Sequence, residues 1–132
     1  QTANKRGVYS FCMCPGGYVI NSSSEEGLLN INGMSYHARN SKNANSAIIV
    51  TVSEKDYGKG LFGGMKFQEE LERKAYEIGK GRIPVCRFKD FKQGVCTNYF
   101  GKVKPLMKGG YHYAPVYQIY PKTIRNSLIE SI

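Results

Sequence analysis

The residues best suited to chemistry lie in one short stretch, Cys12-Met13-Cys14-Pro15-Gly16-Gly17. On an extended strand, residues two apart project from the same face, which would place both thiols side by side. The two glycines carry no side chain, so a flat ligand could approach their backbone closely. The simpler alternative is a hairpin with two buried cysteines, because free cysteine is among the most buried residue types. The residues alone favour this alternative.

The elements around this stretch are predicted from its flanks. Apolar, β-prone segments run from Val8 to Phe11 and from Tyr18 to Ile20. Pro15 lacks a backbone donor and the two glycines after it tolerate positive φ, so the sequence predicts a strand, a sharp turn and a return strand. The thiols would then lie beside the turn of a hairpin.

A second hairpin is predicted from residues 28–31, with its turn at Asn32-Gly33 and its partner strand over 34–39. The polar residues that follow are expected to organise a loop, and they include Asn43, Asn45 and Ser46. Residues 47–52 are almost continuously apolar, which indicates a strand buried on both faces.

Two helices are predicted after these strands. In residues 65–78, apolar side chains recur every three or four positions, at Phe67, Leu71, Ala75 and Ile78. Gly79 stands where a helix C′ residue is expected. Residues 122–132 predict a final helix with Thr123 as N-cap. The chain therefore reads as a single α+β domain over 1–132, with antiparallel hairpins, barrel-like or sheet-like, in its first half.

Three other kinds of site have weaker signals. Residues 58–63 fit G-x-G-x-x-G, but residues 53–57 separate them from the preceding strand, so we interpret the match as a chance one. Cys-His catalysis would need Cys12 or Cys14 close to His37, and spacing does not fix that. A metal site would have to use scattered ligands, and we expect none. Those ligands are Cys12, Cys14, Cys86, Cys96, His37 and His112.

The composition is basic, with a formal net charge of +9 over 132 residues. This charge permits anionic partners. One alternative function is therefore a small basic binding module for RNA or a protein partner. Its candidate residues are Lys102, Lys104, Lys108, Tyr111, Tyr113 and Tyr117. No pattern of a known RNA-binding module is present, so a nucleic acid is the less favoured partner.

The sequence also gives an expectation for the cellular location of the chain and for its place in a longer protein. No apolar run approaches the length of a membrane span and no signal peptide is recognisable, so we expect a cytoplasmic location with reduced thiols and no membrane partner. The chain opens on Gln1 without an initiator Met and closes on Ile132 within a helical pattern. We therefore expect a piece of a longer protein.

Four collinear blocks resemble a family of bacterial FAD-dependent dehydrogenases. They read Tyr-Ser-Phe-Cys-Met-Cys-Pro-Gly-Gly-Tyr-Val (9–19), Ser-Ser-Glu-Glu-Gly (23–27), Asn-Gly-Met-Ser-Tyr-His-Ala-Arg (32–39) and Asn-Ala-Asn-Ser-Ala (43–47). The similarity continues through residues 67–75 and 84–91, and it is poor over 94–121.

This resemblance implies a two-lobed flavoprotein in which a Rossmann-type domain, absent from this chain, holds the FAD. The present chain would be an inserted substrate or cap domain that covers the flavin, inactive by itself. Its partners would be the FAD domain of the same polypeptide and a small-molecule substrate. The full-length protein would be an oxidoreductase that transfers a hydride between substrate and flavin.

The resemblance also implies roles for particular residues. Cys12, Cys14, Pro15, Gly16 and Gly17 would line the flavin-facing wall as cofactor-binding residues. Tyr36, His37 and Arg39 are the candidate catalytic residues for substrate orientation or proton delivery, because Tyr and His transfer protons and Arg can clamp a carboxylate. For each of these three, a role in folding is an equally open alternative.

Overall fold

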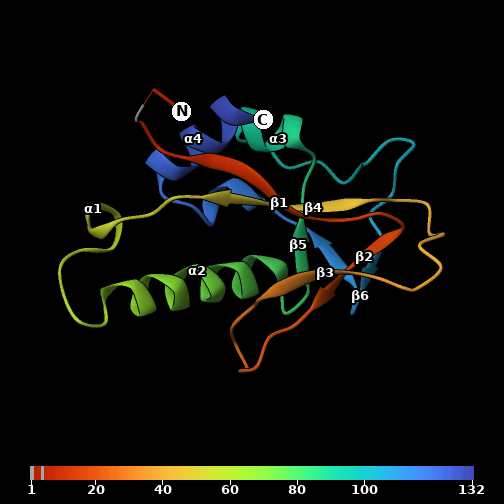
Figure 1. Ribbon diagram of the computed structural model, residues 1–132, viewed down its shortest axis with the longest axis horizontal. Helices are drawn as coiled ribbons and strands as arrows, with labels where there is room; N and C mark the ends of the chain where they lie inside the picture. Colours follow the sequence, from red (N-terminus) through yellow and green to blue (C-terminus); the bar gives the residue numbers. More distant parts are fainter. Residues whose placement is uncertain (1, 4) are drawn as a thin grey trace.

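The computed structural model describes residues 2–3 and 5–132. Its strands are β1 (Val8–Cys14), β2 (Gly17–Asn21), β3 (Ile31–Ser35), β4 (Asn45–Val50), β5 (Ile83–Val85), β6 (Met107–Lys108) and β7 (Tyr111–Tyr113). Its helices are α1 (Glu54–Tyr57), α2 (Gly63–Gly79), α3 (Phe88–Gln93), the 3-10 turn η1 (Val116–Gln118) and α4 (Lys122–Ser131). The four longer strands come first and the longer helices follow, which confirms the predicted α+β class (Figure 1).

The strands form three small sheets. β1 and β4 pair antiparallel as a two-stranded ribbon, which we call the ribbon. β2 lies between β3, antiparallel to it, and the short β6, parallel to it. β5 and β7 make a short parallel pair. Sequence-distant segments therefore meet in every sheet.

The first predicted hairpin is wrong in its pairing. β1 ends and β2 begins where the sequence indicated, but Pro15 and Gly16 carry the chain from the ribbon into a different sheet. β1 also contains a bulge at Cys12, where the register shifts between Phe11 and Met13 and φ is +50°. The bulge breaks the alternation that would have placed Cys12 and Cys14 on one face.

The second predicted hairpin is also wrong. Asn32 and Gly33 lie inside β3, opposite Ile20 and Val19 of β2, instead of forming a turn. The glycine is needed there for a different reason, because a Cβ at this position would collide with the side-chain oxygen of Asn45.

The long helices lie close to their predicted positions. α2 begins two residues earlier than predicted and includes Gly79, so Lys80 takes the left-handed cap position with φ +52°. Gly79 instead packs closely on Pro84. α4 begins after Pro121, which takes the cap position predicted for Thr123.

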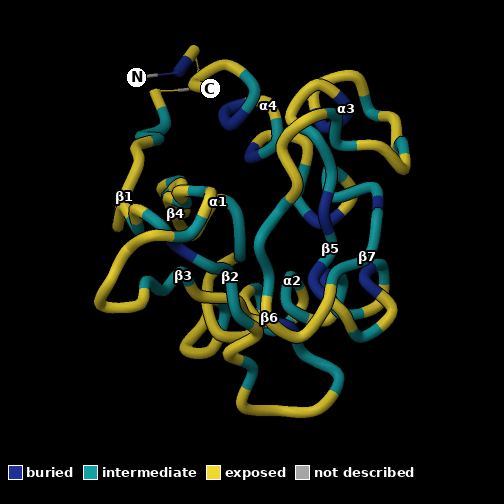
Figure 2. Tube along the Cα trace, turned by 90° about the vertical axis from the view of Figure 1, so that its right-hand side faces the viewer, coloured by how far each residue is buried: buried dark blue, intermediate teal, exposed yellow. Residues whose placement is uncertain are grey.

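The buried residues lie mainly in the helices and around β5, whereas the ribbon is largely exposed, as the burial colours show (Figure 2). One cluster joins Leu29, Ala75 and Ile119, and a second joins Phe91, Ile124 and Leu128. Val8 and Val50 of the ribbon pack on the second cluster. The prediction that the 47–52 strand is buried on both faces is wrong for this chain, since Ile48 is 44% exposed.

Candidate functional site

The structure brings the two groups of predicted site residues together at one place, which we call the corner (residues 12–17 and 35–39). Ser35 Oγ donates a hydrogen bond of 2.9 Å to the carbonyl oxygen of Pro15. Gly16, at φ +58°, packs directly against the backbone of Arg39. Chain segments that are twenty residues apart therefore form one surface.

The glycines of the corner serve contacts within the chain. A Cβ on Gly16 would collide with the Arg39 carbonyl, and a Cβ on Gly17 would collide with Cys14 and Asn45. Gly17 is buried and its N–H donates to the Asn43 carbonyl at 2.9 Å. The side-chain directions of both glycines are therefore filled by protein. Cys12, Met13 and Pro15 are the exposed members of residues 12–17.

Of the polar residues expected to organise a loop, Asn43 lies before β4, whereas Asn45 and Ser46 are the first residues of β4. Asn43 Nδ2 donates to the Lys104 carbonyl at 2.6 Å, and Asn45 Nδ2 donates to the Tyr18 carbonyl at 3.3 Å. The Asn45 bond joins the ribbon to the three-stranded sheet.

The side chains of the three predicted catalytic residues face different surroundings. Tyr36 packs edge-on against Tyr18, with ring centroids 5.5 Å apart. The Lys108 ammonium lies 4.3 Å from the Tyr36 ring centroid and 5.5 Å from that of Tyr18, a favourable cation–π geometry. His37 and Arg39 are exposed. The corner thus carries a partly open cation–aromatic cluster. The sequence singled out Tyr36 as a site residue, but it could not place Lys108 beside Tyr36, because Lys108 is distant in the chain.

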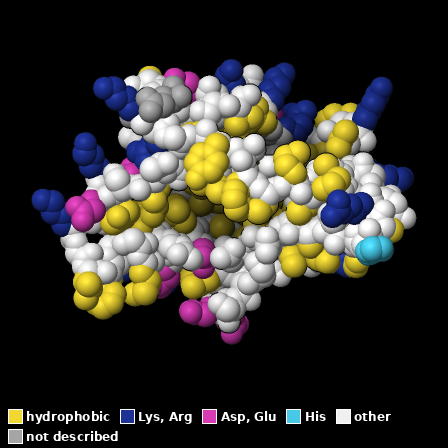
Figure 3. Space-filling model, viewed as in Figure 1, with side chains coloured by type: hydrophobic (Ala, Val, Ile, Leu, Met, Phe, Trp, Pro, Cys, Tyr) yellow, Lys and Arg dark blue, Asp and Glu magenta, His cyan; other side chains and the backbone are white. Residues whose placement is uncertain are grey.

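A larger feature lies at the other end of β3, an open cavity of about 520 Å³ that we call the cleft. α2 forms one wall with Phe67, Leu71 and Ala75, and the opposite wall comes from Ile31 and from Val50 and Val52 at the end of the ribbon. The space-filling view has apolar side chains gathered around this hollow (Figure 3). Tyr36 is five residues beyond Ile31 on an extended chain, so the corner and the cleft are about 16 Å apart.

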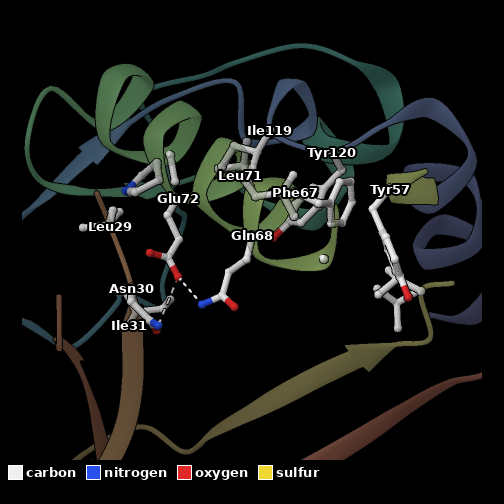
Figure 4. A pocket seen from close by; sticks show the side chains of 16 residues that line it. Leu29, Asn30, Ile31, Tyr57, Phe67, Gln68, Leu71, Glu72, Ile119 and Tyr120 are labelled. Carbon is white, nitrogen blue, oxygen red and sulfur yellow. Dashed lines mark hydrogen bonds between the residues drawn. The ribbon is translucent and has the colours of Figure 1, made fainter. Parts of the chain in front are cut away.

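One polar cluster lies at the mouth of the cleft. Glu72 Oε1 accepts hydrogen bonds from Gln68 Nε2 at 2.8 Å and from Asn30 Nδ2 at 3.4 Å (Figure 4). Leu29 N–H donates to the backbone carbonyl of Glu72 at 3.1 Å. A carboxylate therefore stands at the edge of an apolar cavity, held by two carboxamides.

Tyr120 is shared by the cleft and a neighbouring apolar cavity of about 500 Å³ beneath the ribbon. Burial raises the pKa of Tyr120, so its hydroxyl is neutral and able to donate. Burial also raises the pKa of Cys86, in the second cavity, to about 11, so this thiol is protonated near neutral pH.

None of the eight predicted site residues lines these two cavities. The one usable signal in the sequence for the cleft is the apolar stripe of α2, which by itself predicts packing against the core. The stripe only partly packs, because Phe67 and Leu71 also face the open space. The wall opposite α2 comes from strands that are distant in sequence, and no local pattern predicts that these strands lie beside α2.

The glycine motif, Cys-His catalysis and a metal site were the other kinds of site considered from the sequence, and the structure supports none of them in the residues that it describes. Gly58–Gly63 follows the short helix α1 and not a strand, so it lacks the strand–turn–helix form of a dinucleotide loop. Within residues 2–3 and 5–132, no hydrogen bond joins Cys12 or Cys14 to His37, and no group of three or more His, Cys, Asp or Glu side chains is placed to hold a metal ion.

The fold and these sites define a mixed α+β domain with an apolar cleft and a cation–aromatic corner. Residues 1–132 match the family described as "FAD-dependent protein, C-terminal domain-like", and the chain belongs to this family. An uncharacterized protein of Clostridium beijerinckii is 45% identical over 131 residues, which are 97% of this chain and 25% of that protein. The chain thus spans about a quarter of the length of this relative.

Across residues 2–3 and 5–132, no helix combines the length and the apolar character needed to cross a bilayer.

Proposed function

We propose that this chain is the substrate or cap domain of a flavin-dependent oxidoreductase, and that it covers the flavin and lines the substrate cavity. The observation that carries the proposal is the open, apolar cleft in a domain of an FAD-dependent family. Small-molecule sites are typically apolar cavities with a few placed polar groups, and they occur preferentially between domains. The cleft, with Glu72 at its mouth and Tyr120 in its wall, has this character.

The FAD itself would be bound by another part of the polypeptide. The Gly58–Gly63 segment lacks the preceding strand that a dinucleotide loop needs, so this segment is not a cradle for the pyrophosphate. Bound FAD would supply the hydride-transfer chemistry. This chain would supply walls that exclude water and orient the substrate.

The corner is the surface of this chain that we assign to the flavin side. Exposed Cys12 and Pro15 are available to contact a ring, and the filled spaces beside Gly16 and Gly17 make the turn rigid. Arg39 and His37 extend into solvent beside it, where they can bind a carboxylate or move a proton of the substrate. Tyr36 is engaged by Lys108, which favours a role in holding this surface.

The test is the visible absorption of the full-length polypeptide after gel filtration. We expect flavin bands, and we expect a Cys12→Ser/Cys14→Ser variant to change the band shape or the rate of reduction by dithionite. Cys96→Ser is the matched control, because Cys96 is exposed and lies outside the corner. A colourless protein that takes up no added FAD would contradict the proposal. If both variants change the flavin bands and the rate of reduction equally, the corner does not contact the flavin, but the rest of the proposal stands.

No observation favours the alternative of a basic RNA-binding module. Its tyrosines are engaged with other side chains: Tyr113 stacks on Phe100 with ring centroids 4.6 Å apart, Tyr111 packs edge-on against the same ring at 5.8 Å, and Tyr117 lies under Arg125. Rings packed in this way offer few free faces for bases.

A further inference from the structure

The ribbon is apolar on both of its faces. Residues directly opposite in an antiparallel pair share a face, so the register of β1 and β4 sorts the side chains into two sets. Val8, Ile48 and Val50 lie on the inner face, where Val8 and Val50 pack toward α4, whereas Ile48 and its polar partner Ser10 are exposed. The outer face carries Tyr9, Phe11, Ala47 and Ile49.

The outer face is not covered by the described residues of this chain. Tyr9 is 55% exposed and Phe11 is 54% exposed. Strands that face water on one side usually alternate apolar and polar residues, whereas strands with apolar side chains on both sides are normally covered on both. The sequence of the ribbon therefore favours a cover on each face, and the described residues of this chain cover the inner face at Val8 and Val50.

The edges of the ribbon lead to the same conclusion. Among residues 2–3 and 5–132, β1 and β4 pair only with each other, so each strand has one open edge. Proteins protect open edges with charged residues, proline or β-bulges; neither strand contains a charged residue or proline, and the bulge in β1 lies at Cys12, toward the end of the strand. An isolated two-stranded pair is also only marginally stable in water.

We propose that the outer face of the ribbon is the surface on which the remainder of the same polypeptide docks. The inference rests on the proposed function in one respect, that this chain is a domain of a longer flavoprotein. A relative of which this chain spans 25% leaves most of its length outside the domain, which is ample chain to supply the missing cover. Because the ribbon carries no charge, the surface that meets it is apolar, rich in aliphatic or aromatic side chains.

The test measures the accessibility of a single thiol on the outer face, in the full-length polypeptide. Tyr9→Cys places a thiol opposite Ile49, at a position that is 55% exposed and lines neither large cavity, and Ser24→Cys places a control thiol on the exposed loop between β2 and β3. Each protein is treated with N-ethylmaleimide at low concentration, and the labelling rate of each cysteine is read by mass spectrometry relative to its rate in denaturant. We expect the thiol at position 9 to react at least about tenfold more slowly than that at 24.

The labelling rates distinguish what covers the outer face of the ribbon. Equal rates at positions 9 and 24 would overturn the docking surface. Protection at 9 that disappears on dilution, together with a dimeric mass, would assign the face to a second copy of the chain and also overturn the proposal. Protection at 9 in a monomer that binds no FAD would support the docking surface while refuting the flavoprotein function.

Discussion

The carboxylate of Asp56 links the N-terminal segment at Arg6 to the start of α1. Its oxygens accept hydrogen bonds from Arg6 at 2.6 and 2.8 Å, and from the N–H of Ser53, the N-cap of α1, at 2.9 Å. Both partners of the ion pair are nearly buried, with 15% and 6% of the side chains exposed. Hydrogen bonds to charged groups in such positions contribute more than surface pairs.

We expect Asp56→Ala to lower the free energy of unfolding by about 1.5–3 kcal/mol at pH 7. The Arg6 guanidinium lowers the pKa of Asp56 below its ordinary value of 3.8. A carboxyl with a lowered folded pKa stabilises the protein above its unfolded pKa, and this stabilisation is lost as pH falls through the folded pKa. The deficit of the variant in urea unfolding should therefore shrink below pH 3.8. A deficit that is unchanged by acid would contradict the ion pair, and Asp56→Asn is the uncharged control.

Gly33 lies in the middle of β3, where the side chain of Asn45 leaves no room for a Cβ. We expect Gly33→Ala to destabilise the domain by about 1–3 kcal/mol, because the new methyl group would displace the Asn45 side chain that bonds the Tyr18 carbonyl. Gly64→Ala is the matched control. Nothing lies within 4 Å of that position on α2, so it should be neutral or stabilising by about 0.5–1 kcal/mol. Thermal unfolding of both variants compares them, and equal melting temperatures would rule out the close approach at Gly33.

At the scale of elements, the sequence predicted which segments form helices and strands better than it predicted which strands pair. α2 and α4 were predicted because an apolar stripe is local and recurs with helical spacing. The two hairpins were not correct, because Pro15-Gly16 and Asn32-Gly33 are turn signals only when the neighbouring strands pair with each other. Here β1 pairs with β4 instead, and the side chain of Asn45 takes the space above Gly33. The cleft could not be predicted, since its two walls meet only through these distant pairings.

α2 gives a direct test of the cleft. Leu71 lies on its wall, and we expect Leu71→Trp to fill the space and weaken binding of the neutral apolar dye Nile red by about tenfold or more. Glu77→Trp is the control, because Glu77 is an exposed residue of the same helix outside the cleft. Dye fluorescence is titrated against each protein. Equal affinities for the two variants would mean that the dye binds elsewhere and that the cleft does not take apolar ligands.

At the scale of the whole molecule, the proposed roles place three surfaces in one arrangement. The inner face of the ribbon, with α2, encloses apolar space, its outer face receives the rest of the polypeptide, and the corner at the end of β1 lies between them. A substrate in the cleft and a flavin held by the other lobe would then meet along the ribbon. Anything that loosens the ribbon should therefore act on the flavin, although no residue of the outer face lines either large cavity except Ala47.

Tyr9→Ser tests this arrangement in the full-length polypeptide. Removing an apolar ring from the outer face should weaken docking, so that trypsin separates the domain faster and dithionite reduces the flavin faster, each by about tenfold. Tyr99→Ser is the matched control, because Tyr99 is 64% exposed and lies far along the chain from the ribbon. Faster proteolysis with an unchanged rate of reduction would mean that the domain docks through the ribbon without covering the flavin. Unchanged rates of both would contradict docking and covering together.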